Sequence, residues 1–334
     1  MRRPAHACLG LSHLSALRVG AVWMIEQLSF LPSRRAPRLP VLDQRARGTR
    51  FQGIEVRSAL NSPAATHMGF WSLNPYIGCE FGCAYCYARD THRWTLERLG
   101  TDPAEPRSFE RDILVKTNLV RAIIRTLDPV KLAGQTLAIG TATDPYQPAE
   151  RRFRLTRLAL EALLAYRDIK IGITTKSPLV ARDIDLLTRL QQRHAVRVNM
   201  SLATVDARLA RRLEARTAVP AARLRAVRRL ADAGIRAGIF VMPVVPCITD
   251  RRSQLDALLA AAKQAGASFI AWSALRLGPA ARRHFLPHLA REFPDLVARY
   301  QRHYGHGDNA DRAYCRALDA RFESLRRKYG FVTD

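Results

Sequence analysis

Three cysteines lie close together in one short stretch of the sequence. Cys79, Cys83 and Cys86 follow the spacing C-x3-C-x2-C and make up half of the chain's six cysteines. Thiolates gathered in this way bind zinc or iron–sulfur groups. Three of them can hold three irons of a four-iron cluster and leave the fourth iron open to a second molecule. The spacing therefore indicates chemistry rather than a structural staple.

A structural zinc ion is the competing interpretation of the same cysteines. Such an ion takes four protein ligands, and His92, shortly after Cys86, could supply the fourth. Structural zinc sites usually combine C-x2-C with a second, separate pair of ligands, whereas these three thiols form one tight loop. The loop also follows an expected first strand, at the end of a strand where barrel enzymes gather their active sites. Both observations favour catalysis.

Strand-like and helix-like segments alternate from Trp71 onward. Short apolar runs predict strands near 72–76 and at 135–140, 169–174, 196–202, 235–243 and 269–275. Apolar residues at helical spacing predict helices at 154–166, 183–190, 206–213, 220–233 and 253–265. This alternation predicts a parallel sheet with right-handed crossovers. The pattern stops short of eight units, so we expect an α/β fold, a partial (β/α)6 TIM-like barrel.

The rest of the chain divides into a leader, an arm and a tail around this core. Residues 1–23 are expected to be a mis-called or disordered leader, with Met24 as the true start. A signal peptide is disfavoured because polar and basic residues interrupt the apolar stretch. Residues 24–66 are expected to form an extended N-terminal arm, 67–278 the core, and 279–334 a basic helical C-terminal extension.

The charge and the cysteine content bear on partners and location. The net charge is +25, from 54 Lys and Arg against 29 Asp and Glu, which makes nucleic acid a possible partner. Many arginines lie on expected helix faces, as in 223–230, where a solvated helix face is the favoured explanation. No run of about 18 apolar residues is present, so we expect no membrane span. Isolated cysteines in a long chain predict a reducing, cytoplasmic location.

The cysteine loop with its flanks and three other stretches match a known family. An aromatic residue, Tyr85, stands just before the last cysteine, and the match continues through 74–89, 140–150, 175–177 and 243–250. Together these stretches resemble the radical S-adenosylmethionine (SAM) superfamily, in its spore photoproduct lyase-like branch. The resemblance covers roughly residues 45–295. It implies that the predicted barrel is the radical SAM core.

The resemblance also implies a mechanism and its cofactors. Cys79, Cys83 and Cys86 would hold a 4Fe-4S cluster, and SAM would bind the open iron through its amino and carboxylate groups. An electron from the reduced cluster would break SAM into methionine and a 5′-deoxyadenosyl radical, which abstracts a hydrogen atom from the substrate. The hard chemistry belongs to the cofactors, and the protein orients them. A low-potential donor such as flavodoxin or ferredoxin is the implied partner.

Other residues receive roles from the same resemblance. Tyr85 would lie beside the adenine of SAM, Thr143 and Asp144 would face its polar groups, Lys176 would meet its carboxylate, and Ser201 would bond its ribose or amino-acid end. Each has a plain structural alternative: a packed aromatic ring, the Asp144-Pro145 turn, a solvated lysine and a strand-end hydroxyl.

One departure from the branch limits the prediction. Spore photoproduct lyases use a thiol after the second strand as hydrogen-atom donor, and residues 141–144 contain no cysteine. Cys247, at the end of an expected strand, is the candidate donor, although a lone cysteine is more often a small buried apolar residue. Tyr87 would stand beside the cluster on the return path of the radical.

The sequence therefore predicts a radical SAM enzyme, lyase-like or of another radical type, whose substrate it does not identify. A DNA-repair lyase acting on pyrimidine photoproducts is the alternative reaction. A metal-stabilised nucleic-acid-binding protein without catalysis is the alternative of another class.

Overall fold

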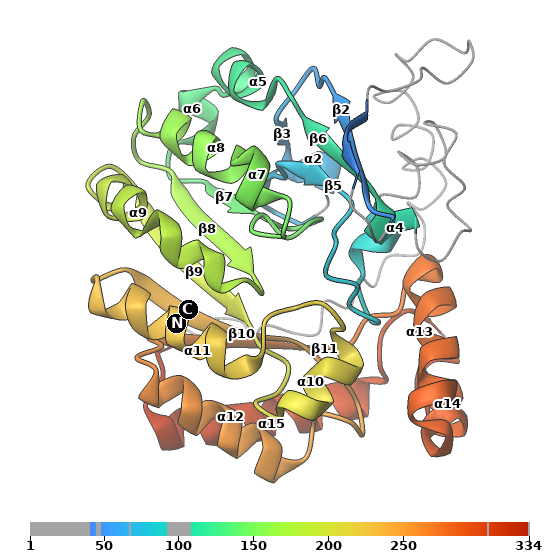
Figure 1. Cartoon of the computed structure of the whole chain (residues 1–334). Helices are drawn as coiled ribbons and strands as arrows, with labels where there is room; N and C mark the ends of the chain where they lie inside the picture. The colour runs from blue at the N-terminus through green and yellow to red at the C-terminus, as the bar shows by residue number, and fades with distance from the viewer. Residues whose placement is uncertain (1–40, 45–47, 67, 92–107, 306, 333–334) are drawn as a thin grey trace.

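A curved sheet of parallel strands forms the centre of the molecule (Figure 1). The structure, a computed structural model, describes residues 41–44, 48–66, 68–91, 108–305 and 307–332. Seven strands pair in the order β11-β10-β9-β8-β7-β4-β3, and all but β3 run parallel to their neighbours. Their bounds are β3 Leu60–Asn61, β4 Trp71–Leu73, β7 Thr136–Ile139, β8 Lys170–Thr175, β9 Ala195–Ser201, β10 Arg236–Val244 and β11 Phe269–Ala274.

Helices follow the parallel strands and cover the outer face of the sheet, as Figure 1 shows. The helices between the strands are α7 Glu150–Phe153, α8 Leu155–Leu163, the 3-10 helix η1 Pro178–Asp183, α9 Ile184–Gln191, α10 Ala207–Leu213, α11 Pro220–Asp232 and α12 Arg252–Gln264. The predicted alternation, and with it the partial (β/α)6 barrel, is confirmed. It stays open, because β11 and β3 are the two edges of the sheet and do not pair with each other.

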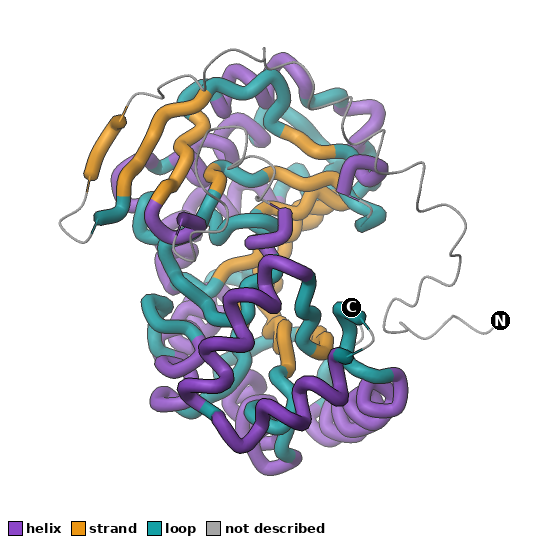
Figure 2. Tube along the Cα trace, turned by 90° about the vertical axis from the view of Figure 1, so that its right-hand side faces the viewer, coloured by secondary structure: helices purple, strands orange, loops and turns teal. Residues whose placement is uncertain are grey.

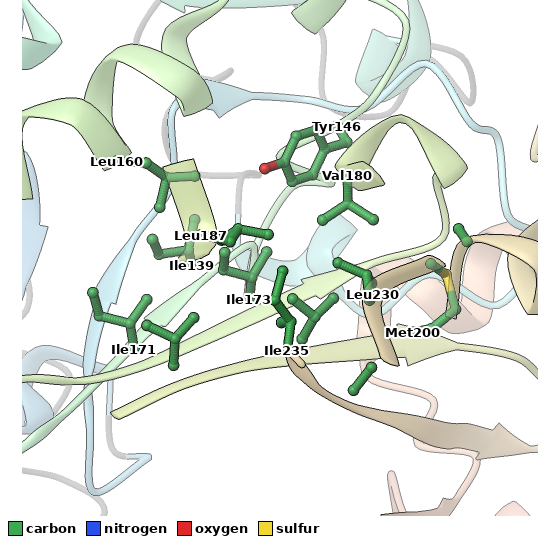
Figure 3. Close-up of a cluster of buried hydrophobic side chains, with 14 of the residues drawn as sticks. Ile139, Tyr146, Leu160, Ile171, Ile173, Val180, Leu187, Met200, Leu230 and Ile235 are labelled. Carbon is green, nitrogen blue, oxygen red and sulfur yellow. The ribbon is translucent and has the colours of Figure 1, made fainter. Parts of the chain in front are cut away.

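The strands present an apolar face to the helices and a more polar face to the inside of the barrel. Ile171 and Ile173 of β8 are fully buried in the cluster of apolar side chains drawn in Figure 3. On the opposite face, Thr174 Oγ1 accepts a hydrogen bond from Asn199 Nδ2 at 3.1 Å. Side chains alternate between the faces of a strand, so Lys176, two residues beyond Thr174, continues the inner row. The hydrophobic effect thus fixes which residues face inward.

A second, smaller sheet joins the N-terminal arm to the core. Its order is β1-β2-β6-β5, and β2 pairs in parallel with β6, Arg50 lying opposite Asp112. The bounds are β1 Val41–Gln44, β2 Arg50–Ile54, β5 Tyr76–Ile77 and β6 Asp112–Lys116, with helices α2 Pro63–Thr66, α4 Ser108–Arg111, α5 Leu119–Thr126 and α6 Pro129–Leu132 beside these strands in the chain. Within the described residues of the predicted arm, 41–44 and 48–66, the strands β1, β2 and β3 are therefore paired within sheets. The predicted leader, 1–23, and residues 24–40 lie outside the described residues.

The C-terminal extension is helical, as predicted. It contains α13 Pro279–Glu292, the 3-10 helix η2 Pro294–Leu296, α14 Val297–Tyr304 and α15 Arg312–Tyr329. Phe322 of α15 stacks on Trp272 of β11 with ring centroids 4.8 Å apart, which fixes this helix to the edge of the sheet. In the turned view of Figure 2, α13 and α14 lie in front of the strands. None of the described helices combines the length and the apolar character needed to cross a membrane.

Candidate active site

The three cysteines lie on one loop that follows β5. Cys79 and Cys83 are buried, Cys86 is partly exposed, and all three are free thiols. The Cys79 N–H donates to the carbonyl of Phe109 at 2.9 Å, which fastens the start of the loop to α4, and the Cys86 N–H donates to the carbonyl of Cys83 at 3.3 Å. The loop therefore turns back on itself, and the thiols lie close enough to influence one another electrostatically.

These thiols fit the donor set of an iron–sulfur cluster. Burial raises the pKa of each of them, so the free thiols are neutral, whereas bound iron would stabilise the thiolates. Three cations act against burial: the Lys176 ammonium lowers the pKa of Cys83 and Cys86, the Arg223 guanidinium lowers that of Cys83, and the Arg89 guanidinium lowers that of Cys86. Three free soft donors on one loop are what a cluster bound by three thiolates requires.

The zinc interpretation asks for ligands that converge on one ion. Within the ranges that the structure describes, no group of three or more His, Cys, Asp and Glu side chains is arranged to hold a single metal ion. Each thiolate of a cluster binds a different iron, so a cluster needs no such convergence. His92, the proposed fourth zinc ligand, lies outside the described residues.

The loop after β7 holds the start of the cysteine loop. Thr143 Oγ1 donates to the carbonyl of Gly78 at 2.6 Å, and Gln147 Nε2 donates to the same carbonyl at 3.2 Å. Gln147 Oε1 in turn accepts from the Glu80 N–H at 3.0 Å. The hydroxyl of Thr143 is thus engaged with the backbone of the cysteine loop, and its predicted contact with SAM stays a prediction.

Asp144 joins the ends of β7 and β8. Its Oδ1 accepts from the Thr175 hydroxyl at 2.6 Å and from the Tyr146 N–H at 2.9 Å, and its Oδ2 accepts from the Lys176 N–H at 2.7 Å. Burial raises the pKa of Asp144, although these hydrogen bonds oppose the rise. Asp144 therefore forms the expected turn and also positions the backbone of Lys176.

Lys176 and Ser201 meet at the carboxyl ends of β8 and β9. Lys176 Nζ donates to Ser201 Oγ at 2.8 Å and lies 5.6 Å from the centroid of the Tyr85 ring. Burial lowers the pKa of Lys176, but the neighbouring Glu214 carboxylate raises it and the net shift is upward, so the ammonium stays charged. The structure thus brings two predicted SAM-facing residues together beside the cysteine loop.

A buried acid–base group lies against Cys83. Glu214 accepts hydrogen bonds from the Tyr85 hydroxyl and from Arg223 Nη2, and its Oε1 is 3.8 Å from Lys176 Nζ. Burial raises the pKa of Glu214, but Arg223 and Lys176 outweigh burial and lower it to about 2. Tyr85 is only 4% exposed, so its hydroxyl is committed to Glu214, and its predicted place beside adenine stays a prediction.

A second charged group lies on the other side of the loop. Arg89 forms a buried ion pair with Glu110, and its Nη2 lies 3.1 Å from Nε2 of His284 in α13. Burial and the Arg89 charge lower the pKa of His284 to about 4. The neutral ring of His284 can therefore accept from Arg89.

His284 makes a contribution to stability that depends on pH. An unfolded histidine binds a proton near pH 6.5, whereas His284 in the folded chain binds it only near pH 4. The unfolded state therefore binds more protons in this window, and stability falls as pH falls from 6.5 to 4. Between pH 7 and pH 5 we expect the free energy of unfolding of His284→Gln to fall by about 1–2 kcal/mol less than that of the unaltered protein. Denaturant unfolding at the two pH values measures this difference. An unchanged pH slope in this variant would contradict the assignment.

The two predicted radical-handling residues lie in different places. The Tyr87 hydroxyl donates to the carbonyl of Thr141, and its side chain is 44% exposed. Cys247 follows β10 and lines a cavity of about 440 Å³ between α10 and the C-terminal helices, together with Leu209 and Ile248. Its sulfur accepts from Arg299 Nη1 at 3.4 Å. The roles of both residues stay predictions.

Several residues of the site carry no clear signal in the sequence. Glu214 and Arg223 sit in ordinary helical segments, and the contact between Tyr85 and Glu214 joins residues 129 positions apart. Asn74 and Gln147 belong to the stretches that resemble the family, but their roles in fastening loops appear only in the structure. The side-chain amide oxygen of Asn74, Oδ1, accepts from the Ala142 N–H at 2.9 Å. The sequence predicts that the arginines of 223–230 lie on a solvated helix face, but Arg223 is 1% exposed and binds Glu214, so that prediction is wrong for Arg223.

Comparison with known proteins gives the family. Residues 73–258 match the family model of the radical SAM superfamily. An uncharacterized protein of Mycobacterium tuberculosis is 34% identical over 317 residues, covering 94% of this chain and 89% of the relative. An uncharacterized protein of Methanocaldococcus jannaschii is 28% identical over 179 residues, covering 53% of this chain and 61% of that one.

Solved structures show the same fold. A mutant form of spore photoproduct lyase matches with a TM-score of 0.63 at 15% identity, over 94% of this chain and 93% of that chain. Spore photoproduct lyase complexed with dinucleoside spore photoproduct matches with a TM-score of 0.59 at 15% identity, over 84% and 79%. At such low identity these matches establish the fold alone.

Proposed function

The chain belongs to the radical SAM superfamily, and on that basis we propose that it cleaves SAM reductively at a 4Fe-4S cluster and abstracts a hydrogen atom from a substrate. One observation carries the proposal. Three free thiols, Cys79, Cys83 and Cys86, share one loop near the carboxyl ends of the barrel strands, and the charge of Lys176 reaches two of them. In barrels of this kind the carboxyl ends of the strands carry the active site.

The protein's own residues have distinct tasks in this reaction. The bound cluster and SAM supply the electron transfer and the 5′-deoxyadenosyl radical. Lys176 and Ser201, already hydrogen-bonded to each other, offer a cation and a hydroxyl to the carboxylate and amino-acid end of SAM. Thr143 and Asp144 support the site by holding the cysteine loop and the backbone of Lys176, and we retain the prediction that they face SAM.

Apolar packing around the cysteines supports radical chemistry. The cysteines belong to a buried cluster with Leu213, Val245 and Leu275, each no more than 1% exposed. Such a surrounding keeps water from a reactive intermediate and strengthens the electrostatic effect of nearby charges. Tyr85 and Tyr87 flank Cys86. Tyr85, which lies beside Lys176, would contact the adenine of SAM, and Tyr87 would take part in the return path of the radical.

For the hydrogen-atom donor we propose Cys247. Its place in a cavity of about 440 Å³ supports the proposal, because the thiol faces a space that a substrate can enter. The electron donor we propose is a flavodoxin or ferredoxin. Nucleic acid is the substrate class that the net charge of +25 favours, and pyrimidine photoproducts are its first candidates.

Anaerobic reconstitution tests the proposed function. We expect the protein to take up about four irons per chain, as a cluster of this kind requires. With dithionite and SAM we expect 5′-deoxyadenosine and methionine in equal amounts. Stoichiometric zinc without SAM cleavage would show that the metal-stabilised binding protein is the correct interpretation.

The substrate is then found by isotope transfer. Candidate substrates carrying deuterium, among them DNA with pyrimidine photoproducts, are incubated with the reconstituted protein, and deuterium is sought in 5′-deoxyadenosine. A salt-sensitive affinity for DNA would support a polynucleotide substrate. Its absence would point to a small molecule or a peptide instead.

A further inference from the structure

The group formed by Lys176, Glu214 and Arg223 places two cations and one anion beside the cysteine loop. Glu214 pairs with Arg223 while both side chains are at most 2% exposed, and it lies 3.8 Å from Lys176. All three residues influence the Cys83 thiol electrostatically: Lys176 and Arg223 lower its pKa, and Glu214 raises it. Two positive charges and one negative charge leave a net charge of +1 next to a cluster ligand.

The backbone fixes this group against the cysteine loop. Cys83 forms an antiparallel bridge with Glu214, and the Ala84 N–H donates to the carbonyl of Leu213 at 2.9 Å. The Arg216 N–H donates to the carbonyl of Phe81 at 3.1 Å. These backbone contacts hold Glu214 beside Cys83, so the carboxylate charge acts on this cluster ligand.

Stability alone does not explain a buried carboxylate at this place. A buried ion pair is often no more stabilising than apolar residues of the same size. The surrounding apolar cluster makes each charge act strongly, because it lowers the local dielectric. The charge of Glu214 therefore acts on its buried neighbours, which are Lys176, Arg223 and Cys83.

We propose that Glu214 is a positioning residue that keeps the reduction potential of the cluster low, by offsetting one of the two buried cations. The inference rests on the proposed function, in which the cluster must donate an electron to SAM. Reduction adds negative charge to a cluster, so nearby cations favour it and nearby anions oppose it. With Lys176 and Arg223 alone, the cluster would be easier to reduce and a weaker reductant. Glu214 restores part of its reducing power.

Glu150 provides a matched control inside the same chain. It is also a buried glutamate bound by a tyrosine and an arginine: its Oε2 accepts from the Tyr76 hydroxyl at 2.5 Å, and its Oε1 accepts from Arg182 at 2.9 Å. Tyr76 belongs to the main core, whereas Tyr85 belongs to the apolar cluster that contains the cysteines. The two carboxylates therefore share their chemistry, and of the two it is Glu214 that forms a backbone bridge with a cysteine of the loop, Cys83.

The test measures the midpoint potential of the reconstituted cluster by EPR-monitored redox titration. We expect Glu214→Gln to favour reduction by about tenfold, a positive shift of about 59 mV for one electron, while SAM cleavage slows. Glu150→Gln should leave the midpoint potential near that of the unaltered protein. Glu214→Asp keeps the negative charge, so its potential should lie much closer to that of the unaltered protein than the potential of Glu214→Gln does. Lys176→Met removes a cation and should shift the potential in the negative direction.

The outcomes separate the inference from the proposed function. A Glu214→Gln potential equal to that of the unaltered protein, or shifted no more than that of Glu150→Gln, would overturn the inference and leave the proposed function intact. If Glu214→Gln does not assemble a cluster, Lys176→Met decides: a negative shift supports the electrostatic role and an unchanged potential overturns it. An unaltered protein that binds no cluster overturns the proposed function and the inference with it.

Discussion

Alanine at Cys83 is expected to abolish cluster assembly and SAM cleavage. The remaining two thiols, Cys79 and Cys86, leave a second iron without a protein ligand, in addition to the iron that SAM would bind, so the cluster is lost or incomplete. Loss of even an outer partner of a metal ligand costs 10–100-fold in affinity or activity, so loss of the ligand itself should cost at least about 100-fold in the rate of 5′-deoxyadenosine formation. Iron content and product formation are measured on the same reconstituted sample.

Cys315→Ala is the control for that substitution. Cys315 is 4% exposed and lies in the same apolar cluster as Cys83, but on α15, outside the cysteine loop. Its replacement removes a small buried side chain and should cost about 1 kcal/mol of stability, with iron content unchanged. A Cys83→Ala protein that keeps four irons and full cleavage, or a Cys315→Ala protein that loses both, would contradict the assignment of the ligands.

Alanine at Gly140 is expected to destabilise the fold strongly and to displace the loop that holds the cysteines. Gly140 has φ +90°, and a Cβ there would lie 2.5 Å from Pro145 Cδ and 2.5 Å from the carbonyl oxygen of Thr174. An L-residue pays about 1–2 kcal/mol for a left-handed backbone, and overpacking adds about 1–3 kcal/mol. We expect the free energy of unfolding, measured with denaturant, to fall by about 2–5 kcal/mol. Iron uptake should also weaken, because Thr143, which holds the start of the cysteine loop, lies in the same loop as Gly140.

Gly134→Ala separates backbone strain from steric overlap. Gly134 also has positive φ, +66°, but a Cβ there meets nothing within 4 Å. Its replacement should therefore cost only the conformational term, about 1–2 kcal/mol, and leave iron uptake unchanged. Equal losses in the two variants would show that the contacts of Gly140 with Pro145 and Thr174 do not matter.

The sequence predicts the barrel and the cysteine loop well because both depend on patterns within short stretches of the chain. The apolar runs at 135–140 and 169–174 become β7 and β8, and the helical spacing at 220–233 becomes α11. Burial on one face of a helix or strand repeats at a fixed period, so a short window is enough to detect it. The thiol spacing of Cys79, Cys83 and Cys86 is likewise local.

The smaller sheet could not be predicted in this way. The stretch Asp112–Lys116 is buried at every position and so has no alternation, and its partner strand Arg50–Ile54 lies far back in the chain. Backbone hydrogen bonds do not depend on side-chain identity, so their partners leave little trace in composition. Residues 34–66 of the predicted arm are rich in Pro, Arg and Gly, and their apolar residues show only weak periodicity. The sequence therefore predicts an extended arm over 24–66.

Residue type and spacing are properties of neighbouring residues, and they are enough to predict which residues can bind a cluster. The strand that the cysteine loop follows, β5, belongs to the smaller sheet, which the sequence did not predict. Only the tertiary structure brought Glu214 and Arg223 against Cys83, and Ser201 against Lys176. The physical reason is that parallel strands join segments far apart in the chain, and the charges at their carboxyl ends meet only when the sheet has formed. The local spacing of the cysteines predicts the cluster ligands, and the folded barrel determines which charges surround them.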